Sequence, residues 1–135
     1  MHEVAQGVWG RARERGERLF ETWAGALCSL ASASGSRLDE ARTELQAVEG
    51  VCSALSDEAL AEQIDVLGYL AQASSLLERS DDALKYARRG MRLAQSTSCP
   101  GMYGLCPVVW ARRMPQRAYS RASSLRSSSD DACAR

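Results

Sequence analysis

The stretch that decides the fold is residues 67–95, LGYLAQASSLLERSDDALKYARRGMRLAQ. Its apolar residues recur every three or four positions, which is the period of one helix face. The triplet Ser80-Asp81-Asp82 in its middle has the composition of a helix N-terminus, where a hydroxyl caps free N–H groups and acids suit the helix dipole. Strand patterns are nearly absent from the chain. We therefore expect two antiparallel helices joined by a short turn.

Two further helices precede this stretch and carry the same helical spacing. Gly35 is a natural stop for the first helix, and Ser36 and Ser56 are natural N-caps for the two that follow. The pattern predicts helices over residues 18–34, 37–55, 58–78 and 81–96. The expected apolar faces are Phe20, Trp23, Leu27 and Leu30; Leu38, Ala41, Leu45, Val48, Cys52 and Leu55; Leu60, Ile64, Leu67, Ala71, Ser74 and Leu77; and Ala83, Ala87, Met91 and Ala94.

These helices group into two tandem hairpins, residues 20–55 and 60–95. The alanines Ala41 and Ala83 begin the second helix of each and are 83 − 41 = 42 residues apart. Helical repeats run from about 34 to about 47 residues. The sequence thus predicts an all-α fold of stacked hairpins, an α-solenoid fragment. We expect its core to contain Leu45, Val48, Leu67, Leu70, Ala83 and Ala87.

The second hairpin resembles a tetratricopeptide repeat. Leu67, Leu70, Ala71 and Ser74 fall on the W-x₂-L-G-x₂-Y positions of its first helix, and Ala83 and Ala87 fall on the A-x₃-F positions of its second. Several consensus residues are replaced: Leu67 stands for Trp, Ala71 for Gly, Ser74 for Tyr and Ala87 for Phe. The repeat is therefore degenerate.

Residues 67–95 are also similar to the helical-repeat region of large LuxR-type transcriptional regulators of bacteria. That resemblance covers about residues 20–110 and implies an ATPase domain before the repeats and a DNA-binding helix-turn-helix after them. Neither is evident here, because no G-x-x-x-x-G-K-[ST] motif and no second helix-turn-helix occur. The resemblance implies a fragment that receives a signal or binds a protein partner, or the regulator's own missing domains. The alternative is a free-standing small helical adaptor unrelated to transcription.

Composition points away from several classes of protein. Seventeen basic and 17 acidic residues cancel, so the whole chain has no net attraction to nucleic acid. No secretory signal and no run of about 20 apolar residues occurs, and the five cysteines form no CxxC pair. We therefore expect a cytoplasmic bacterial protein with free thiols and no membrane association. With fewer than about three repeats, it should be marginally stable or self-associating.

Few residues are candidates for chemistry, and we expect no enzyme and no cofactor. His2, the only histidine, lies at the N-terminus, where disorder is the default. Cys28 and Cys52 fit core packing better than catalysis. The acids Asp57, Glu58, Glu62 and Asp65 fit a solvated face, and Cys99 and Cys106 could form a redox pair across a Pro/Gly loop. Contact with an acidic partner or a phosphate is a candidate role for Arg88, Arg89 and Arg92.

The chain divides into three segments: an N-terminal extension over 1–17, a helical-repeat region over 18–110 and an Arg/Ser-rich tail over 111–135. The repeat spacing places the start of a third hairpin at 102–110. The tail holds six arginines, six serines and one leucine. Three interpretations stay open: an out-of-frame sequence, a disordered tail with phosphorylation sites at Ser120 or Ser124, and a nucleic-acid-binding arm around Tyr119.

Overall fold

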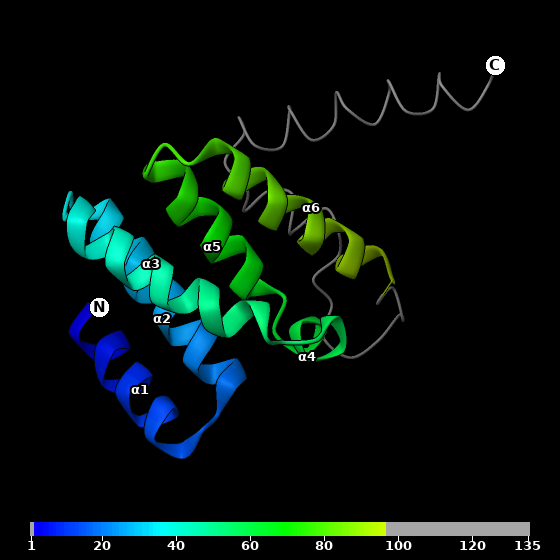
Figure 1. Ribbon diagram of the computed structural model, residues 1–135, viewed down its shortest axis with the longest axis horizontal. Coiled ribbons are helices and arrows are strands. Elements are labelled where there is room, and N and C mark those ends of the chain that lie inside the picture. Colours follow the sequence, from blue (N-terminus) through cyan, green and yellow to red (C-terminus); the bar gives the residue numbers. More distant parts are fainter. Residues whose placement is uncertain (1, 97–135) are drawn as a thin grey trace.

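The computed structural model describes residues 2–96, and all regular structure in that range is helical (Figure 1). The predicted all-α class is therefore confirmed for these residues. The third hairpin expected at 102–110 and the tail over 111–135 lie outside them. The helices are α1 (His2–Arg15), α2 (Arg18–Ser34), α3 (Leu38–Ser53), α4 (Asp57–Glu62), α5 (Asp65–Leu76) and α6 (Ser80–Ser96).

The predicted helix over residues 58–78 is in fact two helices, α4 and α5. The chain leaves helical geometry at Gln63, the C-cap of α4, with φ −136° and ψ 58°. Leu60, Ile64 and Leu67 are nevertheless all buried, so the apolar period continues across the break. Periodicity alone therefore could not reveal it. The other three predicted helices correspond to α2, α3 and α6 with ends within two residues.

Most of the N-terminal extension is a helix, α1, and His2, which was expected at a disordered end, is its first residue. α1 packs along α2 through buried Ala5 and Ala12 and half-buried Trp9. Gly16 then turns the chain into α2 with φ +70°, a backbone conformation that favours glycine. The apolar periodicity of this helix is weak in the sequence, because its buried face is made mainly of alanines and one tryptophan.

Helix α2 holds the central position in the packing. It contacts α1, α3 and α5, while α5 in turn packs against α6. In Figure 1 the helices α1, α2, α3, α5 and α6 lie side by side, with α1 and α6 at opposite ends and the short α4 in the link between α3 and α5. The largest fully buried side chains are Leu45, Leu60, Leu67, Leu70, Val48 and Val66.

All six residues predicted for the core are buried, which confirms that prediction: Leu45, Val48, Leu67, Leu70 and Ala87 are fully enclosed, and Ala83 is 3% exposed. The face predicted for the first helix is wrong at its start, since Phe20 is 51% exposed. Leu38, predicted for the second face, is 41% exposed. α2 instead buries small residues, namely Ala24, Gly25, Ala26, Cys28, Ser29, Ser32 and Ala33.

The small residues let α2 lie close to its neighbours. A Cβ atom added to Gly25 would overlap Val48 Cγ2 on α3 and come within 2.9 Å of Trp9 Cε2 on α1. Glycine at this position thus brings three helices together at one point. A large apolar residue there would push them apart, which is why a face rich in small residues is the buried one.

Two helix–helix turns have the same backbone geometry, 42 residues apart. Ser36 and Glu78 each have φ 61°. The next N–H, of Arg37 or Arg79, donates to the carbonyl of Ser32 or Ser74 at 2.9 Å in both turns. This six-to-one bond is the Schellman arrangement that ends many helices.

Two of the predicted helix ends are corrected by these turns. The N-cap of α3 is Arg37, and Ser36 is the left-handed turn residue rather than the predicted cap. Gly35 does follow α2, but with φ −84°, so the left-handed position falls one residue later. The predicted cap at Ser56 is confirmed, because its hydroxyl accepts a hydrogen bond from the N–H of Ala59 at 3.2 Å.

The contact at Gly25 predicts a large difference between two glycine-to-alanine substitutions. Gly25→Ala should lower the free energy of unfolding by about 1–3 kcal/mol, because the added methyl overpacks the α1–α2–α3 contact. Gly50→Ala, on the exposed side of α3, meets nothing within 4 Å. It should raise the stability by up to about 1 kcal/mol through helix propensity alone. Urea denaturation checks both, and equal effects would show that Gly25 is not a contact point.

Candidate functional site

The three arginines predicted as a partner contact have different roles on α6. Arg89 lies against the end of α3 and the start of α4: its guanidinium contacts Asp57 Oδ1 at 2.7 Å and donates to the carbonyl of Leu55 at 3.3 Å. Arg88 and Arg92 are exposed, four residues apart, and make no ion pair within residues 2–96. A contact with an acidic partner therefore stays a prediction for this exposed pair, while Arg89 holds two elements together.

A polar cluster between α3 and α6 centres on Glu49. Arg79 donates to its carboxylate at 3.0 Å and also pairs with Asp82 at 2.7 Å. The hydroxyl of Tyr86 donates to Glu49 Oε1 at 3.2 Å. Burial of the ring, together with the negative charge of Glu49, raises the pKa of Tyr86 above its ordinary value of 10.0.

His2 lies in a polar cluster formed by α1, α2 and α3. Its Nε2 is 3.0 Å from Glu44 Oε1 and 3.0 Å from Ser32 Oγ. One donor atom each from His2, Cys28 and Glu44 lie within 4.8 Å of one another. The side chain of His2 is only 15% exposed, so the disorder expected for it is wrong.

The described cysteines are buried thiols rather than exposed nucleophiles. Burial, assisted by the carboxylate of Glu44, raises the pKa of Cys28 to about 11. Burial likewise raises the pKa of Cys52. In the His2 cluster the carboxylate and the Ser32 hydroxyl both approach Nε2, whereas a nucleophilic relay needs the orienting acid on the opposite ring nitrogen. These residues therefore lack the arrangement of a thiol protease. Cys99 and Cys106 lie outside the described residues.

The four acids that could have formed a carboxylate pair lie on α4 and the first turn of α5. Asp57 pairs with Arg89, Glu58 and Glu62 are exposed, and Asp65 is half-buried. None of them lines the hollow described next.

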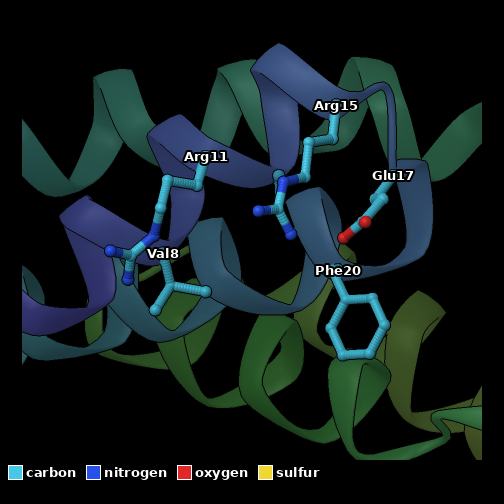
Figure 2. Close-up of a pocket in the computed structure, with 6 residues that line it drawn as sticks. Val8, Arg11, Arg15, Glu17 and Phe20 are labelled. Carbon is cyan, nitrogen blue, oxygen red and sulfur yellow. The ribbon is translucent and has the colours of Figure 1, made fainter.

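An open hollow of about 150 Å³ lies between α1 and α2. Figure 2 shows Arg11 beside Val8 on α1, and the side chain of Glu17 between Arg15 and Phe20 of α2. Both arginines are exposed and make no ion pair with another residue in the described range. The hollow therefore combines apolar side chains with two cationic groups and one carboxylate, that of Glu17. The sequence signal that could have found it is the spacing of Val4, Val8, Arg11 and Arg15, which share one helix face.

Within residues 2–96, no helix is both long enough and apolar enough to cross a bilayer. Comparisons with models of known protein families, with curated proteins and with solved structures find no match. The resemblances to tetratricopeptide repeats and to LuxR-type regulators therefore stay predictions.

The raised pKa of Tyr86 predicts a specific loss of stability in alkali. A group whose pKa is higher in the folded state stabilises the fold fully below its unfolded pKa, and that stability is lost as the pH rises further. The free energy of unfolding should therefore fall above about pH 10. Tyr86→Phe should cost about 1 kcal/mol at pH 7, through the lost hydrogen bond, and should flatten the alkaline decline. Denaturation from pH 7 to pH 11 measures both, and an identical decline in wild type and variant would exclude Tyr86 as its source.

Proposed function

We propose that this chain is a non-catalytic helical-repeat segment that binds an acidic segment of a partner protein in the hollow between α1 and α2. The observation that carries the proposal is the composition of that hollow. It offers the exposed aromatic ring of Phe20 beside two arginines, Arg11 and Arg15, and one acid, Glu17, so positive groups outnumber negative ones there. An amphipathic peptide with a bulky apolar residue and flanking carboxylates is complementary to such a surface.

The proposed tetratricopeptide-like architecture is supported by the packing of the helices. α2 pairs with α3 and α5 pairs with α6, and the two pairs meet mainly through α2 and α5. The two hairpin turns share their backbone bonds and left-handed residues at the spacing of Ala41 and Ala83. In both hairpins an arginine at the turn also pairs with an acid three residues later: Arg37 with Glu40 and Arg79 with Asp82. Stacked hairpins of this kind act in proteins as binding scaffolds.

A place within a LuxR-type transcriptional regulator is the finer form of the proposal and rests on the resemblance of residues 67–95. It is tested on the gene. If the chain is a truncated or frame-shifted regulator, another reading frame downstream of the Trp110 codon should encode a Leu/Ala-rich sequence with helical periodicity. Farther downstream, that frame should encode a helix-turn-helix. If the chain is an independent adaptor, no such frame should exist.

The hollow predicts that a charge reversal on α1 weakens peptide binding. The probe is a fluorescein-labelled amphipathic peptide with Glu and Leu on opposite helix faces, measured by fluorescence anisotropy at low and moderate salt. Arg11→Glu/Arg15→Glu should weaken binding at least about tenfold, because two attractive pairs become repulsive. The wild-type affinity should also fall as salt rises.

The matched control is Arg88→Glu/Arg92→Glu, which makes the same charge change at two exposed residues four apart on α6. It should leave the affinity within about twofold of the wild type. If this variant loses binding and the α1 variant does not, the binding surface is on α6 and the hollow is not the site. Absence of measurable binding in the wild type would contradict the proposal as a whole.

A further inference from the structure

We propose that His2, Cys28 and Glu44 bind one zinc ion between α1, α2 and α3. The imidazole, thiol and carboxylate come from three different helices, and one donor atom of each lies within 4.8 Å of the others. In tetrahedral zinc sites, sulfur lies about 2.3 Å and nitrogen or oxygen about 2.0–2.2 Å from the metal, so the donors lie about 3–4 Å apart. Only small side-chain movements separate the observed cluster from that arrangement.

One ring nitrogen of His2 makes two hydrogen-bond contacts in the cluster. His2 Nε2 lies 3.0 Å from both Glu44 Oε1 and Ser32 Oγ, but a ring nitrogen carries at most one hydrogen. If Nε2 carries that hydrogen, the Glu44 carboxylate and the accepting Ser32 oxygen share a single donor. If it accepts from the hydroxyl, two lone pairs face each other at Glu44. A cation between the imidazole and the carboxylate would accept a lone pair from each and so remove this repulsion.

Glu44 supplies a second observation that points to a cation. Its side chain is only 10% exposed, and its Oε2 is buried without a hydrogen-bond partner among the described residues. A buried carboxylate oxygen with no donor costs free energy, and metal coordination is one of the ways proteins compensate it. The neighbouring thiol of Cys28 offers no compensation, because a thiol is only a weak donor.

The donor set selects the metal. Thiolate is a soft ligand that favours zinc and other late transition metals over magnesium and calcium. Three protein ligands of the types N, S and O leave a fourth tetrahedral position for water. Among these metals, zinc does not change its oxidation state in proteins. The proposed site therefore involves no electron transfer.

Comparison of the two hairpins shows what is particular to the first. The positions 42 residues after Cys28 and Glu44 hold Leu70 and Tyr86, which are both buried. The second hairpin therefore fills these places with apolar or aromatic side chains, and the first fills them with a thiol and a carboxylate. Core packing alone does not require that difference, whereas a metal site does.

A zinc ion would attach α1 firmly to the rest of the fold. This helix packs mainly on α2, and its buried residues are only Ala5 and Ala12. Coordination by His2, the first residue of α1, would link it to α2 through Cys28 and to α3 through Glu44. Bound metal should therefore raise the thermal stability of the protein, because an ion that binds only the folded state shifts the equilibrium toward it.

The test uses the full chain with Cys99, Cys106 and Cys133 replaced by serine, so that only the two buried thiols remain. The purified, metal-free protein is titrated with Co²⁺ under reducing conditions, followed by displacement with Zn²⁺. The expected result is one Co²⁺ per chain, with a thiolate-to-cobalt charge-transfer band and the strong visible absorption of a tetrahedral ion. Zn²⁺ should abolish both bands and raise the melting temperature.

His2→Ala, Cys28→Ser and Glu44→Gln should each weaken metal binding at least about tenfold, since each removes a direct ligand. Cys52→Ser is the matched control, because Cys52 is also buried but lies outside the cluster. Its metal affinity should equal that of the background protein, in which only Cys99, Cys106 and Cys133 are replaced by serine. Circular dichroism of the metal-free proteins verifies folding. If Cys28→Ser fails to fold, His2→Ala at the start of α1 carries the test.

Two results would overturn the proposal. One is the absence of a thiolate-to-cobalt band in the background protein. The other is an affinity in His2→Ala and Glu44→Gln equal to that of Cys52→Ser, which would assign the metal to adventitious surface sites.

Discussion

The approach of three helices at Gly25 constrains most of what surrounds it. With no side chain at this position, Val48 of α3 and the Trp9 ring of α1 both reach the backbone of α2. Contact at this distance requires small neighbours, so α2 buries alanines, serines and a cysteine and turns Phe20 outward. The exposed ring is then available to line the hollow beside Arg11 and Arg15. The close helix contact at Gly25 on one side of α2 thus goes together with an exposed aromatic ring, Phe20, on the other side.

The second half of the fold is held together differently. Leu60 of α4 and Leu67 and Leu70 of α5 are fully buried in the core, so large side chains take the place of the small ones of α2 there. Polar contacts attach α6 at two places: Arg79 and Tyr86 meet Glu49 near its start, and Arg89 meets Asp57 farther along. These partly buried pairs link α6 to α3 and to the start of α4. Arg89 is therefore a structural residue even though its neighbours on the same helix are free to meet a partner.

Periodicity sufficed for the helical class, for three of the helices and for all six predicted core residues, because buried Leu, Val and Ala repeat at the helical spacing. It failed where burial depends on smallness, as at Phe20 and Gly25, since an apolar pattern assigns the large residue to the core. It also missed the break at Gln63, where the pattern runs on although the backbone does not. The cluster of His2, Cys28 and Glu44 could not be predicted for another reason: its members are 26 and 16 residues apart in the sequence and meet only through the packing of α1 and α3 on α2. A single histidine near the start of the sequence does not by itself indicate a site, because its neighbours are known only once the packing of α1 is known.

The two hairpin turns have a consequence for how such a chain changes over evolutionary time. Residues 32–37 read SASGSR and residues 74–79 read SSLLER, so only the first and last letters agree. The bonds that shape both turns join backbone atoms, from the Arg37 or Arg79 N–H to the Ser32 or Ser74 carbonyl. Mutation of the intervening side chains leaves those bonds in place. Turns with quite different side chains can therefore keep the same backbone geometry, and a change of sequence within such a turn need not change the angle between the helices that it joins.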